Sequence, residues 1–172
     1  MDRIDIVFSR DALFRQSSDR LFSVSAAAGG DDGAIDALRM EREDADTFDM
    51  LVRSAHSRVK AGLAHLAAEN TGDAVCHAVY DDMAMCPCAV SGLGGGMVVA
   101  DGAIHYDLVL THPMQRHLLP GAIERVLVLY VAEEWLRMRS VPMDLGLGRA
   151  WDELKSVALM CDMPPRRPYS YC

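Results

Sequence analysis

The residues best suited to chemistry in this sequence are cysteines and histidines between positions 76 and 105. Thiolates and imidazoles bind zinc, and Cys76, Cys86, Cys88 and His105 could form such a site. Structural zinc sites usually contain two ligand pairs at C-x₂₋₄-C spacing. Here Cys86 and Cys88 are separated by Pro87 alone, so their spacing is shorter than in such a pair. We therefore interpret the segment as a loop with incidental thiols, and keep a small helical metal- or ligand-binding protein as the alternative function.

Two other groupings could indicate nucleotide binding or catalysis. A glycine run at 92–96 could cradle a phosphate, but such loops open a helix, and strand-like residues follow here. We predict a flexible hairpin tip instead, with Gly94 and Gly95 as candidate contact residues. The second grouping comprises Asp107, His112 and His117. No Ser or Cys nucleophile stands in a recognisable elbow, so we predict no catalytic, cofactor-binding or metal-binding residue and no enzymatic activity.

Charge and composition narrow the class of protein further. The net charge of −8 argues against general binding of DNA or RNA, which requires a basic face. Residues 118–172 contain as many basic as acidic side chains, so residues 1–117 carry the whole negative excess. The first residues lack the pattern of a signal peptide, and no segment has the pattern of a membrane span. We expect a cytoplasmic protein with reduced cysteines, and neither a membrane nor a small-molecule substrate as partner.

A single long helix at 118–139 is predicted to organise the fold. Every residue from 126 to 132 is apolar, so other elements must cover this part of the helix on all sides. Pro120 suits the first turn of a helix, where its missing N–H costs nothing. Glu133 and Arg137 lie four positions apart in the favourable order and mark the exposed end.

Two further helices are predicted to pack against this central helix. The first, at 46–69, has Asp44 or Asp46 as its N-cap and an apolar stripe that excludes His56. Its stripe consists of Phe48, Leu51, Val52, Ala55, Val59, Leu63 and Leu66. The second follows Asp144 as its N-cap. Its apolar positions are Leu147, Trp151, Leu154, Val157, Ala158 and Cys161. Both stripes have the three- and four-residue steps of an amphipathic helix.

The remaining segments predict a short strand, a helix and a hairpin. A strand is expected at 3–8, and the following helix would be capped by Ser9 or Asp11 and end in a mobile loop at 23–33. Residues 74–111 predict a projecting β-hairpin or small meander. Its strands are expected at 74–83, 97–100 and 103–111, with Ile104, Tyr106, Leu108 and Leu110 on one face of the last strand.

The predicted fold is mainly α: a small helical bundle with a projecting β-hairpin between the two long helices. We expect a single domain over 1–172, with a helical core at 34–163 and an extended tail at 164–172. The tail is basic and aromatic, and its candidate contact residues are Arg166, Arg167, Tyr169 and Tyr171. A disordered terminus and a docking arm are both consistent with this composition.

The order of these segments resembles a family of phage structural proteins. An acidic lead-in at 41–46 precedes a helix, a strand with Tyr106-Asp107-Leu108-Val109-Leu110 and a Leu118-Leu119-Pro120 entry. A long helix with Glu134-Trp135-Leu136 and a last helix before Arg166-Arg167-Pro168 follow. This layout resembles tailed-phage (prophage) head–tail connector or adaptor proteins. The resemblance implies a structural role, assembly into a homo-oligomeric ring, phage portal or tail proteins as partners, and a place in the virion if the prophage is active.

Overall fold

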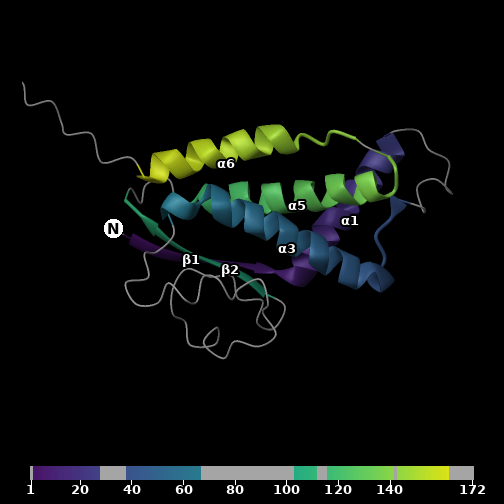
Figure 1. Ribbon diagram of the computed structural model, residues 1–172, viewed down its shortest axis with the longest axis horizontal. Helices are drawn as coiled ribbons and strands as arrows, with labels where there is room; N and C mark the ends of the chain where they lie inside the picture. Colours follow the sequence, from purple (N-terminus) through teal and green to yellow (C-terminus); the bar gives the residue numbers. More distant parts are fainter. Residues whose placement is uncertain (1, 28–37, 67–102, 112–115, 142, 163–172) are drawn as a thin grey trace, which may run out of the picture.

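The structure, a computed structural model, describes residues 2–27, 38–66, 103–111, 116–141 and 143–162 (Figure 1). The elements in chain order are strand β1 (Asp2–Ser9), helix α1 (Arg10–Ala27), 3-10 helix η1 (Arg42–Asp44), helix α3 (Ala45–Gly62), 3-10 helix η2 (Ala64–Leu66), strand β2 (Ala103–Leu110), helix α5 (Leu119–Met138) and helix α6 (Leu147–Asp162). The predicted class is confirmed: the chain is mainly helical, with one small antiparallel β element.

Helix α5 is the centre of the packing. Helices α1, α3 and α6 all contact it, and Figure 1 shows it between them. Every residue of the apolar run 126–132 is buried, as a helix without a polar face requires. Pro120 lies in the first turn, as expected. The predicted central helix is therefore confirmed, within one residue at each end.

The two described strands form an antiparallel pair that joins distant parts of the chain. Their register sets Asp2 opposite Leu110 and Ser9 opposite Ala103. Side chains of β2 alternate between half-buried and buried, and the buried positions are Ile104, Tyr106, Leu108 and Leu110, as predicted. We expected 97–100 to be the partner of this strand, whereas the described partner is the N-terminal strand. The predicted strands 74–83 and 97–100 lie outside the described residues.

Helix α1 is longer than the sequence suggested. Its start is as expected, since the Ser9 hydroxyl accepts a hydrogen bond from the N–H of Ala12 at 3.4 Å. The prediction of a loop from residue 23 is wrong for 23–27, which are helical. Ser23 and Ser25 donate their hydroxyls to carbonyls four residues earlier, at 2.8 and 2.6 Å. Small polar residues that favour loops are thereby satisfied inside the helix.

Helix α3 buries its whole predicted stripe but ends earlier than expected. The α-helix stops at Gly62, and η2 follows in place of a continuous helix to 69. The ring of Trp151 on α6 lies close to Gly62, so a Cβ built there would be 3.3 Å from it. The exclusion of His56 from the stripe is wrong, because this side chain is only 4% exposed. Its position, four after Val52 and three before Val59, places it on the same side of the helix.

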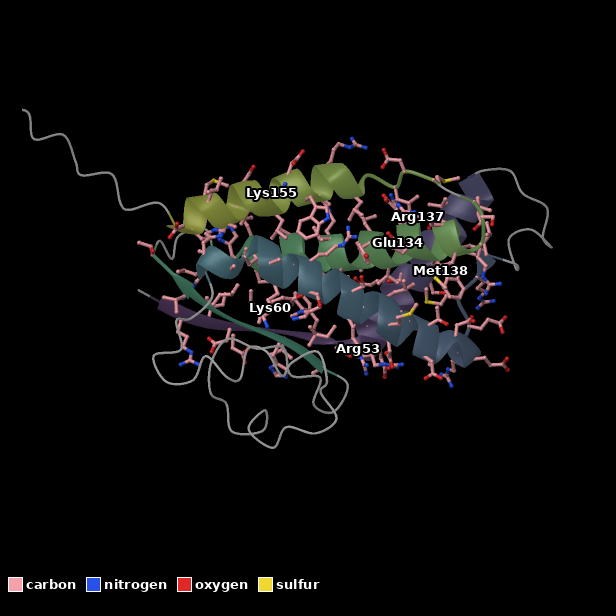
Figure 2. All side chains as sticks on the ribbon, viewed as in Figure 1. Arg53, Lys60, Glu134, Arg137, Met138 and Lys155 are labelled. Carbon is pink, nitrogen blue, oxygen red and sulfur yellow. The ribbon has the colours of Figure 1, made fainter. Side chains whose placement is uncertain are left out.

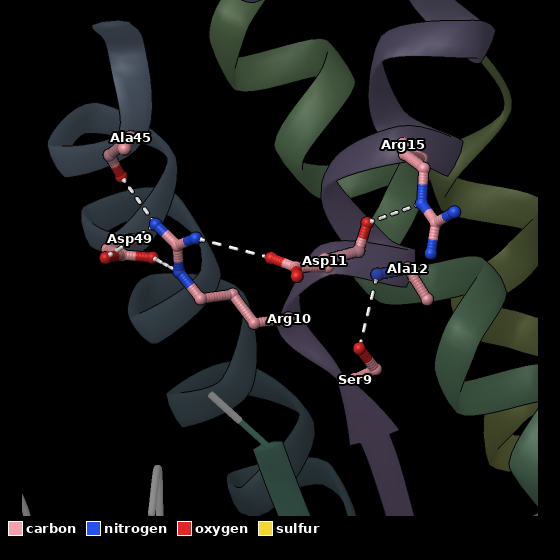
Figure 3. A network of polar contacts seen from close by, with 7 residues as sticks. All are labelled: Ser9, Arg10, Asp11, Ala12, Arg15, Ala45 and Asp49. Carbon is pink, nitrogen blue, oxygen red and sulfur yellow. Dashed lines mark hydrogen bonds and ion pairs between the residues drawn. The ribbon is translucent and has the colours of Figure 1, made fainter. Parts of the chain in front are cut away.

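Polar contacts fix the ends of the helices relative to one another. Arg10, at the start of α1, forms two hydrogen bonds with the carboxylate of Asp49 on α3, at 2.6 and 3.0 Å (Figure 3). At the C-terminal end of α5, Trp135 donates its indole N–H to the carbonyl of Leu38 at 2.9 Å. The guanidinium of Arg139 lies over the same indole, 4.7 Å from its centroid.

The connection between α5 and α6 corrects two expectations. One carboxylate oxygen of Glu133 accepts hydrogen bonds from the N–H groups of Leu145 and Leu147, at 2.9 and 3.1 Å. The start of α6 is therefore capped by the preceding helix, whereas the predicted cap, Asp144, binds only the N–H of Gly146. Glu133 was the expected partner of Arg137, but its carboxylate binds the start of α6. Arg137 donates to the carboxylate of Glu134 at 2.9 Å.

Candidate functional site

Most of the residues selected from the sequence lie outside the described part of the chain. These are the contact residues Gly94, Gly95, Arg166, Arg167, Tyr169 and Tyr171, and the thiols Cys76, Cys86 and Cys88. They remain predictions. The one candidate metal ligand that is described is His105, on the half-buried face of β2.

The described ionisable side chains on the sheet are engaged with each other. His105 Nδ1 lies 3.7 Å from a carboxylate oxygen of Asp5 across the strand pair. Asp107 binds the guanidinium of Arg3 on the opposite strand. Within the described ranges, no group of three or more His, Cys, Asp or Glu side chains could hold a metal ion. The two described strands therefore offer cross-strand contacts between charged side chains, and their described residues form no preformed metal centre.

An open groove between α1 and α6 is a feature of the described surface that could receive a partner. Its volume is about 680 Å³, and α5 forms its floor. The lining residues are Gln16, Arg20, Gly121, Glu124, Arg125, Val128, Leu129, Leu145, Gly146, Arg149, Ala150 and Glu153. Helices α1 and α6 both pack on α5, and no residue of α3 lines the groove. The groove thus lies on the part of α5 that α3 does not cover.

The floor of the groove is apolar and slightly accessible. Val128 and Leu129 are 9% and 8% exposed, more than any other residue of the run 126–132. They are the part of the central helix that the three packed helices leave nearest to solvent. Apolar floor atoms beneath polar walls form a surface suited to a protein segment that brings both kinds of group.

The walls of the groove contain both paired and unpaired charges. Arg125 binds Glu153 at 2.6 Å, and Gln16 donates to Glu124 at 2.7 Å. Arg20 and Arg149, in contrast, have no hydrogen bond or ion pair with any described residue. An unpaired guanidinium with five N–H donors is a ready binding group for carboxylate or phosphate. The groove therefore presents two available cations on a chain whose net charge is −8.

The backbone at the start of α6 lets one of these arginines lie along the groove. Gly146 has φ +92°, a conformation that favours glycine. A Cβ added to it would lie 3.5 Å from Nη2 of Arg149, so the guanidinium lies beside this glycine. Sequence reasoning missed both arginines, since they lie on helices far apart in the chain and belong to no motif. Only the packing of α1 and α6 on the same helix brings them to one groove.

A second unusual cluster lies in the core, where α3 meets the sheet. The rings of His56 and Tyr106 are 4.8 Å apart, and both side chains are buried. Neither imidazole nitrogen nor the phenol oxygen has a hydrogen-bond partner among the described residues. Burial, with a smaller effect of Lys60, lowers the pKa of His56 to about 3, and burial raises the pKa of Tyr106. Neither pKa is suited to general acid–base catalysis near neutral pH.

Comparison with known proteins identifies no relative of this chain, so a proposal about function must rest on the geometry of the structure. No family model matches the chain, and neither a curated protein nor a solved structure matches it. Among the described helices, none combines the length and apolar character needed to cross a membrane. The groove between α1 and α6 is thus the best candidate site.

Proposed function

We propose that the chain is a structural protein of phage origin, similar to head–tail connectors and adaptors, that acts through self-assembly and contacts with other virion proteins. The observation that carries the proposal is the open groove, because its Arg20 and Arg149 have no ion pair with a described residue, on a protein that is acidic. Its polar walls and apolar floor suit a protein partner more than a small substrate, for which sites are mostly enclosed and apolar. No catalytic step is needed for such a role.

The packing of the helices is consistent with a subunit that acts as a rigid body in an assembly. Helix α5 packs against three helices, and its C-terminal end is held by polar contacts of Trp135 with Leu38 and of Glu133 with the start of α6. The backbone of such a well-packed helical subunit is expected to move little on binding, so contact surfaces on it keep fixed relative positions. Fixed positions are what a ring of identical subunits requires.

A further surface suits contact with a different protein. Met138, Val141 and Met143 lie within six positions of one another around the turn after α5 and are 54%, 37% and 38% exposed. Figure 2 shows Met138 next to Arg137 at this end of the helix. Exposed methionines adapt to partners of varied shape. This apolar turn is our candidate for contact with a portal or tail protein.

Light scattering coupled to size exclusion, with negative-stain microscopy of the same fractions, tests the proposed function. We expect oligomers or rings that grow with protein concentration, or rings that form when the portal protein is added. A strict monomer at high concentration that also fails to bind portal protein would refute the proposal. Portal, protease and capsid genes beside the gene of this protein would independently support the phage origin.

A further inference from the structure

We propose that the groove between α1 and α6 binds an exposed acidic stripe of a second copy of this chain, so that subunits assemble head to tail. This inference rests on the proposed self-assembly and names the two surfaces that meet. The acidic stripe consists of Glu43, Asp46 and Met50, at the start of α3. Its partner surface is formed by Arg20 and Arg149 above the floor residues Val128 and Leu129.

The acidic stripe is available for a partner. Glu43, Asp46 and Met50 are spaced by three and four positions along η1 and α3, so they lie on one side of the helix. All three side chains are exposed, Met50 by 54%. Neither acid has a hydrogen bond or ion pair with a described residue, although Asp46 lies within electrostatic range of Arg10.

The two surfaces match in both charge and polarity. The groove offers two unpaired guanidiniums, and the stripe offers two carboxylates without ion pairs. Arginine pairs with carboxylate through directional hydrogen bonds, which fixes orientation as well as attraction. Met50 extends the stripe beyond the acids and can cover the accessible floor at Val128 and Leu129. Free inorganic phosphate would satisfy the arginines but would leave this floor uncovered.

The stripe and the groove are different surfaces of one subunit, so a head-to-tail contact between them is heterologous. The stripe is on η1 and α3, and the groove is lined only by α1, α5, α6 and the turn before α6. One subunit therefore does not fill its own groove, and in the proposed head-to-tail pair each copy retains one free surface. Repetition of such a contact gives a closed ring or an open filament.

Charge reversal on each surface provides the test. The groove variant combines Arg20→Glu with Arg149→Glu, and the stripe variant combines Glu43→Arg with Asp46→Arg. Each variant alone places like charges in the contact, so we expect its apparent dissociation constant for self-association to rise at least about tenfold. In a mixture of the two variants, every groove faces a stripe of opposite charge, and assembly should return.

A matched control carries the same charge change on the same helices outside the groove. Arg15→Glu with Lys155→Glu fulfils this condition, since neither residue lines the groove and both are exposed (Lys155 in Figure 2). We expect this control to assemble as the wild type does. Circular dichroism verifies that all variants keep the helical fold, and sedimentation velocity measures their association.

The outcomes separate this inference from the proposed function. Loss of assembly in both variants, with recovery in the mixture, supports the groove-to-stripe contact. Assembly of the groove variant at wild-type strength overturns it while leaving self-assembly intact. Loss in the groove variant without loss in the stripe variant rejects the stripe as the occupant. A wild type that stays monomeric alone and with portal protein removes both the inference and the proposed function.

Discussion

Replacing His56 with leucine should remove a large acid-dependent loss of stability. The imidazole is 4% exposed and lacks a hydrogen-bond partner for either nitrogen among the described residues. Burial, and to a smaller extent Lys60, lowers the pKa of His56 from 6.5 to about 3. Because leucine has a similar size and no polar atom to desolvate, we expect the variant to be at least as stable as the wild type at pH 7.

The sign and size of the effect follow from the two pKa values. Between pH 6.5 and about pH 3, the unfolded chain binds a proton at His56 that the folded protein does not bind. This difference in proton binding does not affect the free energy of unfolding above pH 6.5. It lowers the free energy of unfolding progressively as the pH falls from 6.5 towards 3. Each pH unit in this window costs about 1.4 kcal/mol, so the wild type should lose about 2 kcal/mol between pH 7 and pH 5 through this group.

Urea unfolding followed by circular dichroism at pH 7 and pH 5 measures the effect. Carboxylates that titrate in this range are common to both proteins, so the difference between wild type and His56→Leu isolates the imidazole. His65→Leu is the matched control, because His65 is exposed on η2, and it should keep the wild-type pH dependence. If His56→Leu loses as much stability as the wild type on acidification, the assignment of His56 as a buried neutral group is wrong.

Three other experiments, two of them with control variants, test the local structure. Glu133→Ala should reduce the free energy of unfolding by about 1–2 kcal/mol, because it leaves two N–H groups at the start of α6 uncapped. Glu134→Ala, which removes only a pair with an exposed arginine, should cost less than about 1 kcal/mol. Gly146→Ala should destabilise by about 1–2 kcal/mol, because φ is +92° there, whereas Gly148→Ala adds a Cβ in open space and should stabilise by about 0.5–1 kcal/mol; thermal unfolding compares them. Cys161 is buried and burial raises the pKa of its thiol, so mass spectrometry should find it unalkylated by iodoacetamide until the protein unfolds.

The sequence predicted the elements whose signals are local. The apolar run of α5 and the stripe of α3 follow from composition and period, and every stripe residue of α3 and η2 is buried. His56 is buried despite its polarity, because its position between Val52 and Val59 places it on the buried side of the helix. In α1, the serines at 23 and 25 favour a loop by composition, yet their hydroxyls are satisfied by helix carbonyls.

Features made by distant parts of the chain could not be predicted. The partner of β2 is β1, and no local turn signal indicates a pairing between strands so far apart. The cap of α6 comes from Glu133 in another helix, where a short-range motif pointed to Asp144. The groove needs Arg20 and Arg149 from helices that meet only through α5. Each of these depends on tertiary packing, which periodicity does not encode.

The strand pair also sets the order in which the chain can fold. Arg3 and Asp107, which bind across the sheet, are 104 positions apart. Closing a loop of about 100 residues costs about 4 kcal/mol of chain entropy, so we expect β1 to pair late, although it is synthesised before β2. Until β2 is made, β1 is an open edge. In a crowded cell, the register Asp2 to Leu110 can form between two copies as well as within one. Slow release from such strand-exchanged dimers would then limit the yield of correctly folded monomers.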